Sequence, residues 1–249
     1  MARIIAVTLR KGGSGKTTTS VNLAMALTLK GKKTLLVDLD PQANATISVG
    51  IDPTTLEKHI NTLFTDINTK TEEAIIKTEY GLYLLPSHPD LAETEAGMRA
   101  TQIGLLKGLL EPLDDEFDYI VLDTPPSESY LTVNALAVAD EVLIPLQAHF
   151  LALRGLQDVL DEVDQVKQGL NPKLKVSGIL PTMVNPRTNI SKTILEEVKD
   201  KYDGMLYPLQ VDFSIKHAEA SLAGKPIVVY DPKHQGSLAY LKLADLLIK

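Results

Sequence analysis

The chain contains 249 residues, of which 44% are hydrophobic, and this is enough for one large domain with a sizeable core. The formal net charge of −7 argues against wholesale coating of nucleic acid. The absence of cysteine excludes disulfides, cysteine-based zinc fingers and iron–sulfur ligation.

Apolar runs of strand length alternate along the chain with amphipathic segments of helix length. This alternation predicts βαβ units and a three-layer α/β fold, in which helices cover both faces of a mostly parallel, twisted sheet. The strands are expected at residues 3–8, 33–38, 82–85, 117–123, 141–146 and 174–181, with a weaker strand at 204–207. The helices are expected at residues 16–30, 90–111, 129–139, 151–168, 189–201, 214–223 and 235–248. Residues 52–80 show no clean period and are expected to form short helices at an edge, within a single domain of residues 1–249.

The first predicted strand leads into a glycine-rich loop, Lys-Gly-Gly-Ser-Gly-Lys-Thr-Thr at residues 11–18, and a helix follows. This order is typical of a phosphate-binding site, because successive backbone N–H groups can turn inward around an anion. Lys16 can reach the β- and γ-phosphates of a nucleotide, and the Thr17 hydroxyl suits Mg²⁺. The loop departs from the pattern G-x-x-x-x-G-K-[ST], since Arg10 replaces the first glycine and a second lysine, Lys11, precedes the glycine pair. We expect nucleotide contacts from Lys11, Gly12, Gly13, Ser14, Gly15, Lys16, Thr17 and Thr18.

Two later strands end in carboxylates, at the edge where open α/β sheets place their chemistry. The run at residues 33–42 ends in Asp38 and Asp40 followed by Pro-Gln, and the run at 117–126 ends in Asp123 followed by Thr-Pro-Pro. Aspartates that end strands often act as helix caps. A glycine-rich loop followed by two acidic strand ends indicates instead a site for a nucleoside triphosphate and Mg²⁺.

These three segments together resemble the ParA/MinD superfamily of deviant Walker A ATPases. The chain is most similar to the short ParA/Soj-type partition and positioning ATPases, which include carboxysome-positioning McdA-like proteins. Lys-Gly-Gly-x-Gly-Lys-Thr resembles the deviant Walker A box, Asp-x-Asp-Pro-Gln the Walker A′ motif, and residues 117–126 Walker B with the start of switch II. The resemblance covers nearly the whole chain and implies a P-loop ATPase with ATP and Mg²⁺ as cofactors. It also implies an ATP-dependent homodimer, in which Lys11 reaches the nucleotide of the partner subunit and Lys16 contacts the nucleotide of its own subunit.

The resemblance assigns catalytic roles to Lys11, Lys16 and Asp40, with Asp40 orienting or activating the attacking water. A cation supplied to the γ-phosphate is worth roughly 10³–10⁵ in rate in such reactions. The residues implied around the metal are Thr17, Asp38, Asp40 and Asp123. Structures of the family imply that the adenine lies near Met183 and Pro208.

The C-terminal quarter is the part of the chain that is least repulsive to DNA. Residues 187–249 contain nine Lys or Arg and eight Asp or Glu, so the net negative charge lies in residues 1–186. Residues 182–192 resemble a ParA stretch with non-specific DNA-binding residues. This resemblance implies double-stranded DNA as a partner, contacted by Arg187, Lys192 and Lys216, with Lys199 and Lys225 as weaker candidates. Residues 211–213 read Val-Asp-Phe where many ParA proteins read roughly Ile-Pro-Arg, so a basic residue is missing. This difference allows three interpretations: the affinity for DNA is weaker, other residues bind the DNA, or the protein binds a surface other than DNA.

The leading interpretation is a positioning ATPase that coats nucleoid DNA as an ATP-bound dimer. A ParB-like or McdB-like adaptor would stimulate hydrolysis, and the cargo would be plasmid or chromosome DNA or a protein body such as a carboxysome. One alternative is a MinD-like membrane ATPase, although the apolar spacing at residues 238–249 is typical of a docked helix, so a membrane partner is not expected. The others are a metabolic enzyme of the superfamily, of dethiobiotin synthetase-like or amidoligase-like type, and a non-catalytic nucleotide-binding scaffold.

The start of the sequence and its apolar runs bear on the cellular location. No signal-like segment and no N-terminal helix-turn-helix extension precede the first predicted strand, and no apolar run reaches transmembrane length. We therefore expect the short form of the family, located in the cytoplasm and associated with the nucleoid.

The histidines are not spaced as metal ligands. We expect ordinary loop or surface residues at His59, His88, His149, His217 and His234.

Overall fold

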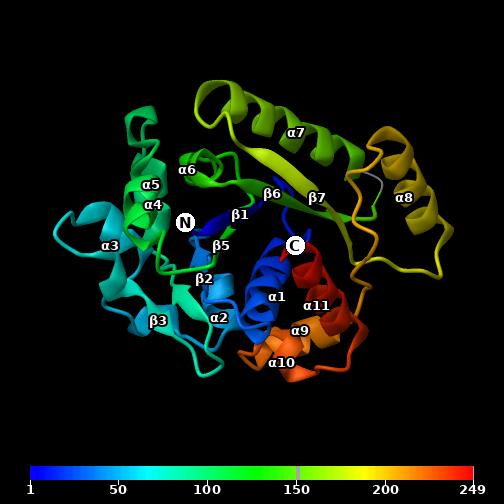
Figure 1. Cartoon of the computed structure of the whole chain (residues 1–249), viewed down its shortest axis with the longest axis horizontal. Coiled ribbons are helices and arrows are strands. Elements are labelled where there is room, and N and C mark those ends of the chain that lie inside the picture. The colour runs from blue at the N-terminus through cyan, green and yellow to red at the C-terminus, as the bar shows by residue number, and fades with distance from the viewer. Residues whose placement is uncertain (150–151, 249) are drawn as a thin grey trace.

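One sheet organises the molecule. The computed structural model describes residues 1–149 and 152–248, and seven strands in these ranges pair in the order β3-β4-β2-β5-β1-β6-β7 (Figure 1). All neighbouring strands are parallel except the edge pair β3 and β4. The strands are β1 (Arg3–Val7), β2 (Thr34–Asp38), β3 (Ile76–Lys77), β4 (Tyr83–Leu85), β5 (Tyr119–Asp123), β6 (Glu141–Gln147) and β7 (Lys175–Thr182). The mostly parallel sheet that the sequence predicted is confirmed.

Both faces of the sheet are covered, which explains why its central strands are apolar at successive positions. In β1, Ile4 and Ala6 pack into one hydrophobic cluster, whereas Ile5 and Val7 pack into another on the opposite face. Helices on the first face are α3 (Ile60–Thr65), α4 (Leu91–Gly97), α5 (Leu105–Leu110), α6 (Tyr130–Val138), α7 (Ala152–Gly169) and α8 (Asn189–Lys201). Helices on the second face are α1 (Lys16–Leu29), α2 (Asn44–Ser48), α9 (Lys216–Leu222), α10 (Ile227–Tyr230) and α11 (Gln235–Leu247).

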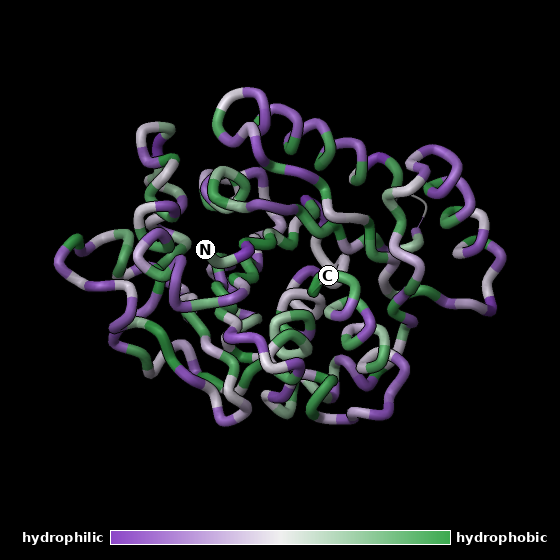
Figure 2. The backbone as a smooth tube through the Cα atoms, in the orientation of Figure 1, coloured by the Kyte–Doolittle hydropathy of each residue, from purple (hydrophilic) through white to green (hydrophobic). Residues whose placement is uncertain are grey.

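The helices differ in how deeply they are buried. Residues 19–27 of α1 are all buried, and this helix lies between the sheet and α11. Helix α7 lies at the surface, and Figure 2 shows hydrophilic and hydrophobic residues alternating along it, as expected for an amphipathic helix. No helix in the described ranges combines the length and the apolar character needed to cross a bilayer.

Several predicted elements differ from the observed ones. Residues 204–207 form a single bridge, Ile179 to Leu206, rather than a strand. The helix predicted at 90–111 is interrupted, because α4 ends at Gly97 and α5 begins after Gly104, whose φ of +106° breaks helical geometry. The segment 52–80 contains α3 and short 3₁₀ turns as expected, but also the antiparallel edge strand β3. Helices α2 and α10 were not predicted, and residue 151, the expected start of a helix, lies outside the described residues.

Candidate functional site

The glycine-rich loop joins the carboxyl end of β1 to α1, and it forms one wall of a cavity of about 370 Å³. Gly13 and Gly15 adopt left-handed backbone conformations, with φ of +70° and +88°, which side chains other than glycine rarely allow. Gly15 immediately precedes α1, so the first N–H groups of this helix face the same cavity as the loop. The residues of the loop and helix start that line it are Gly12, Gly13, Ser14, Gly15, Lys16, Thr17 and Thr18.

Lys16 is held at the base of this cavity. Its side chain is only 6% exposed, and Nζ donates a hydrogen bond of 3.3 Å to the Lys11 carbonyl oxygen. Burial lowers the pKa of Lys16, while the nearby carboxylates of Asp123 and Asp40 oppose this shift. A buried cation that is bonded, within the described residues, to one carbonyl oxygen favours an anionic ligand such as a phosphate.

Asp123 ends β5, directly beside the end of β2, where Asp38 is its register partner. Oδ1 of Asp123 accepts a hydrogen bond of 2.8 Å from the Ser20 hydroxyl. Oδ2 is buried and, within the described residues, has no hydrogen-bond partner of good geometry. Burial raises the pKa of Asp123 to about 6, although Ser20, the nearby Thr17 hydroxyl and Lys16 favour the charged form. This free oxygen fits a metal ion or one of its waters.

Asp38 is fully buried and already bonded through both carboxylate oxygens. Oδ2 accepts hydrogen bonds of 2.8 Å from the backbone N–H and the hydroxyl of Thr46, and Oδ1 accepts one of 3.1 Å from the Asp40 N–H. Burial and the neighbouring Asp123 raise the pKa of Asp38 to about 8. Asp38 therefore orients the segment that carries Asp40, and it is absent from the cavity lining.

Asp40 does line the cavity. Its Oδ1 accepts a hydrogen bond of 2.9 Å from the Gln42 N–H, and its carbonyl oxygen accepts one of 2.7 Å from the Ser87 hydroxyl. Ser87 follows β4 and was not identified from the sequence, although a polar residue just after a strand end was an available signal. These bonds fix a carboxylate in the wall of the cavity, where it can orient a water molecule.

The oxygen ligands fit Mg²⁺ bound together with a nucleotide. Within the described ranges, no three His, Cys, Asp or Glu side chains converge closely enough to hold a metal ion by themselves. Mg²⁺ usually keeps several waters and binds through one or two carboxylates and the phosphates of a substrate. The unpaired oxygen of Asp123 and the hydroxyl of Thr17 meet this requirement.

Lys11 does not line the cavity of its own chain. Its Nζ donates to Oε1 of Gln147, at the end of β6, over 3.4 Å. The preceding Arg10 forms ion pairs with Glu162 of α7 at 3.1 Å and with Glu128 of the loop after β5 at 3.2 Å. Glu162 is 4% exposed, and burial raises its pKa against the opposing effect of Arg10. Arg10 thus ties the start of the glycine-rich loop to two other segments.

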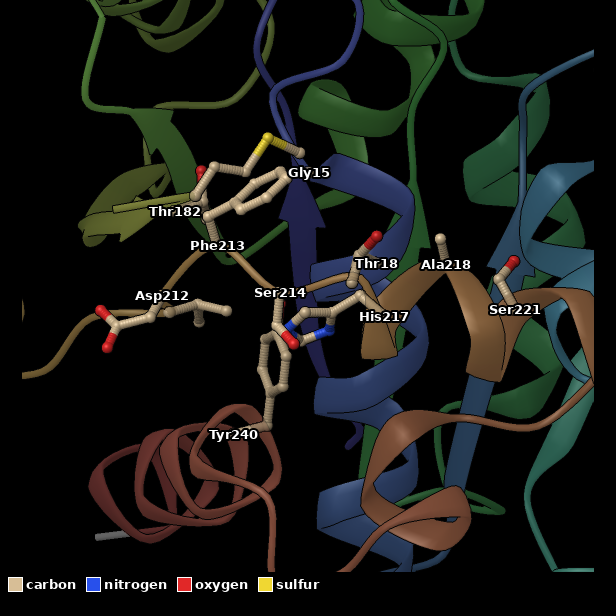
Figure 3. Close-up of a pocket in the computed structure, with 12 residues that line it drawn as sticks. Gly15, Thr18, Thr182, Asp212, Phe213, Ser214, His217, Ala218, Ser221 and Tyr240 are labelled. Carbon is tan, nitrogen blue, oxygen red and sulfur yellow. The ribbon is translucent and has the colours of Figure 1, made fainter. Parts of the chain in front are cut away.

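A second cavity, of about 330 Å³, shares Gly15, Thr18, Met183 and Ser221 with the first. Figure 3 shows the side chains that line this second cavity. Its walls are mainly apolar, which suits the nucleoside part of a nucleotide. Of the two residues predicted near the adenine, Met183 lines this cavity, whereas Pro208 is exposed and lies outside the lining of both cavities. The sequence prediction for Pro208 is therefore not supported. Residues that line the second cavity and were missed include Asp212, Phe213, His217 and Tyr240.

These residues were missed because no local pattern joins them. They come from the chain after β7, from α9 and from α11, and only the fold brings them together. The Val-Asp-Phe departure at residues 211–213 was the one available signal, and it was interpreted in terms of DNA binding. In the structure, Phe213 is 67% exposed at the rim of this cavity.

The candidate DNA-binding residues lie in two places. Arg187 and Lys192 are exposed at the N-terminal end of α8, with the Arg187 N–H bonded to the Asn185 side chain. Lys216 lies on α9, where Nζ forms an ion pair of 2.7 Å with Glu219. The weaker candidates, Lys199 and Lys225, are exposed on α8 and before α10. Arg187 and Lys192 are thus the more available pair.

Comparison with known proteins identifies the family. A family model described as an AAA domain matches residues 2–176. The chain is 42% identical to the chromosome partitioning protein ParA of Myxococcus xanthus, over 100% of this chain and 89% of that protein. It is 40% identical to the sporulation initiation inhibitor protein Soj of Bacillus subtilis, over 98% of this chain and 97% of that protein.

A solved structure is similar over the same length. It is that of the cobyrinic acid a,c-diamide synthase from Mycobacterium smegmatis with bound ADP and magnesium, with a TM-score of 0.86 and 37% identity. The match covers 100% of this chain and 94% of that chain. The fold, the three motifs and these full-length relatives agree, and the chain belongs to the ParA/MinD superfamily of P-loop ATPases, which use ATP and Mg²⁺.

Proposed function

We propose that this chain is a ParA-type positioning or partition ATPase that dimerises with bound ATP and binds double-stranded DNA without sequence specificity. One observation carries the proposal. Lys16 lines the cavity of its own chain, whereas Lys11 does not line it and donates a hydrogen bond to Gln147. A lysine of the glycine-rich loop that is not used by the cavity of its own chain is a candidate to reach the nucleotide of a second copy. The full-length similarity to proteins named ParA and Soj supports the same assignment.

The chain's own groups suffice to describe how hydrolysis would proceed. Backbone N–H groups of residues 12–18 and the Lys16 ammonium would hold the phosphates and stabilise the charge that develops on them. Asp40 would orient the attacking water, since its carboxylate lines the cavity. Asp123 and Thr17 would hold the metal and its waters, and Asp38 would keep the Asp40 segment in place. The metal held by these residues would neutralise part of the charge on the phosphates.

Dimerisation and nucleotide state would then be linked equilibria, because Lys11 of each subunit binds only a site that contains a triphosphate. An adaptor of ParB-like or McdB-like kind would stimulate hydrolysis and release the dimer from DNA. The cargo would be plasmid or chromosome DNA, or a protein body such as a carboxysome. This cycle would take place in the cytoplasm, at the nucleoid.

A second candidate is an amidoligase-like enzyme, which the name of the cobyrinic acid a,c-diamide synthase relative favours. In such an enzyme, the cavity would also have to accept a substrate carboxylate next to the γ-phosphate. A MinD-like membrane ATPase has less support, because Tyr240, Leu243 and Leu247 of α11 are buried against the second face of the sheet. The apolar side of this helix is thereby occupied in the folded chain.

The deciding experiment uses the Asp40→Ala variant, in which we expect slow hydrolysis and a persistent ATP-bound dimer. Binding to a non-specific DNA duplex and to anionic vesicles would be measured with ATP and with ADP, at several salt concentrations. We expect ATP-dependent DNA binding that weakens on the order of 10³-fold between 50 and 200 mM salt if six or more phosphates are contacted. Vesicle binding without DNA binding would favour the MinD-like alternative. Binding to neither, together with ATP turnover by the wild-type protein that requires a carboxylate substrate and an ammonia donor, would favour the amidoligase.

A further inference from the structure

A buried carboxylate is bonded to the start of the glycine-rich loop. Glu162 comes from the middle of α7, and its side chain is 5% exposed. Its Oε2 accepts a hydrogen bond of 3.1 Å from Nε of Arg10, the residue that replaces the first glycine of the P-loop pattern. Neither residue lines the phosphate cavity or the second cavity. A buried ion pair is often no more stabilising than an apolar pair of similar volume, so stability alone does not explain its presence here.

Three consecutive residues at the start of the loop contact the unit formed by β6 and α7. Leu9 packs against α7 at Gly155, where an added Cβ atom would lie 4.0 Å from Cδ1 of Leu9. Arg10 is paired with Glu162, and Nζ of Lys11 bonds the side chain of the last residue of β6. These contacts fix the course of the chain immediately before the first glycine of the loop.

The ion pair also restrains the backbone of Lys11. Besides its bond to Glu162, Arg10 donates from Nη1 to Oε2 of Glu128 at 3.2 Å. A guanidinium that is held by two carboxylates has little rotational freedom, so the peptide that joins residues 10 and 11 is restrained as well. On its other side, the carbonyl oxygen of Lys11 accepts the bond of 3.3 Å from Nζ of Lys16. Lys11 therefore extends from a backbone that is held both before and after it.

The charges of the pair depend on each other. Burial raises the pKa of Glu162, and the charge and hydrogen bond of Arg10 oppose this shift. Burial would lower the pKa of Arg10, but the carboxylates of Glu162, Glu128 and Asp158 outweigh this effect and the pKa is raised. Removing Arg10 would leave the Glu162 carboxylate buried without a counterion, so the segment would have to take up a proton or shift to admit water.

We propose that Glu162 is a positioning residue that acts through Arg10 to hold Lys11 in the orientation from which it reaches the nucleotide of a second subunit. This inference rests on the proposed function, in which Lys11 acts on the nucleotide of the partner. Glu162 contacts neither nucleotide nor metal in this assignment. It lowers the entropy cost of placing Lys11, because a preorganised side chain loses less conformational freedom when the dimer forms. Helix α7 thereby sets how readily two ATP-bound subunits associate.

The test measures dimerisation of Glu162→Gln, Arg10→Gln and the double variant with Mg²⁺ and the non-hydrolysable analogue AMPPNP. We expect each single substitution to weaken the dimer about 5- to 20-fold, and the double substitution to weaken it no further, because all three remove the same ion pair. Analytical ultracentrifugation gives the dimer dissociation constants. The affinity of the monomer for AMPPNP, measured at protein concentrations well below dimerisation, should stay the same, since neither residue lines the phosphate cavity.

The matched control is Glu141→Gln, because Glu141 also forms a buried ion pair with an arginine near β1. Nη2 of Arg3 donates to its Oε2 at 2.7 Å, and Glu141 is 3% exposed. This pair lies at the start of β1, at the opposite end of the strand from the glycine-rich loop. Glu141→Gln should lower the melting temperature and leave the dimer affinity unchanged.

A purely structural role for Glu162 would give a different result. Wild-type dimer affinity in Glu162→Gln, or an equal loss of dimer affinity in Glu141→Gln at a similar melting temperature, would overturn the assignment. A double variant that loses the product of the two single losses would do the same, because it would show that Glu162 does not act through Arg10. If Arg10→Gln does not fold, since its Glu162 is unpaired, the comparison of Glu162→Gln with Glu141→Gln decides alone.

The same measurements distinguish the failure of this inference from the failure of the proposed function. A wild-type protein that binds AMPPNP but does not dimerise would overturn both the positioning ATPase and the role of Glu162. A wild-type protein that dimerises no better than Glu162→Gln would overturn only the role of Glu162.

Discussion

The two sides of the nucleotide site are built in different ways. The phosphate side consists of the glycine-rich loop and the aspartates at the ends of β2 and β5, which are neighbouring strands in the middle of the sheet. The nucleoside side consists of the segment after β7 together with α9 and α11. Two isolated β-bridges, Ile179 to Leu206 and Val184 to Asp212, join β7 and the residues just after it to the chain that leads to α9. Met183, where this segment begins, has a left-handed φ of +49°, unusual for a residue with a side chain. In the proposed site, the phosphate side therefore lies at the ends of adjacent central strands, whereas the nucleoside side is assembled from segments outside the sheet.

The largest expected effect concerns the phosphate side. In Lys11→Ala, hydrolysis should fall by roughly 10³-fold or more, because the partner site loses its second cation. ATP-dependent dimerisation should be lost, while ATP affinity of the monomer changes little, since Lys11 does not line its own cavity. Light scattering with and without ATP and a steady-state ATPase assay measure these effects. Lys173→Ala, which removes an exposed lysine elsewhere, is the control, and an intact ATP dimer in Lys11→Ala would contradict the role in trans.

The next largest effect separates ATP hydrolysis from ATP-dependent dimerisation on the phosphate side. Asp40→Ala should lower turnover by about 10²–10⁴-fold, because the group that orients the water is gone, but it should keep the ATP-bound dimer. Single-turnover hydrolysis and size-exclusion chromatography with ATP give both values. Turnover at the wild-type rate would remove Asp40 from the mechanism.

The candidate residues of the phosphate side could be predicted from the sequence for a physical reason. A phosphate-binding loop needs glycines, a lysine and a hydroxyl group within eight consecutive positions, and residues 11–18 contain all of them. Strand-end aspartates are visible because each follows a buried apolar run. The bonding state of each aspartate was not visible, since Asp38 is bonded by Thr46, a residue of α2 that was not predicted.

The nucleoside side was largely hidden for the opposite reason. Its residues span positions 182 to 240 and meet only through tertiary packing. His217 has the composition and spacing of an ordinary helix residue, and nothing in the sequence shows that Gly236 makes room for its ring. Pro208 was assigned by analogy and lies a few residues before the segment, 211–214, that lines the cavity.

A smaller effect tests the nucleoside side through pH. Burial lowers the pKa of His217 to about 4 in the folded chain, compared with 6.5 in the unfolded chain. The neutral ring therefore contributes fully to the free energy of unfolding above pH 6.5, and this contribution is lost as the pH falls toward 4. After allowance for solvent screening, the loss should be no more than about 2 kcal/mol. His217→Leu should lose less stability than the wild type between pH 7 and pH 5, as measured by urea unfolding without nucleotide. Equal pH dependence in the two proteins would show that the ring is not desolvated.

The smallest expected effect lies on the surface next to the nucleoside side. Arg187→Ala should weaken DNA binding by a few-fold and reduce the salt slope by about one, because one phosphate contact is removed. Lys216→Ala should have a smaller effect, since Lys216 is already paired with Glu219. Titrations of a fluorescent duplex at several salt concentrations would compare the two variants. A larger effect from Lys216 than from Arg187 would move the DNA surface from α8 to α9.

The position of β5 between β1 and β2 also governs when the site can exist during protein synthesis. The glycine-rich loop and the Asp38 segment are synthesised early, but their strands do not pair with each other, and each pairs instead with residues 119–123. The ribosome must therefore complete more than a hundred residues before the phosphate side can close, and the nucleoside side waits for Tyr240. ATP can stabilise only chains in which both parts are present, so it gives no help to early nascent intermediates.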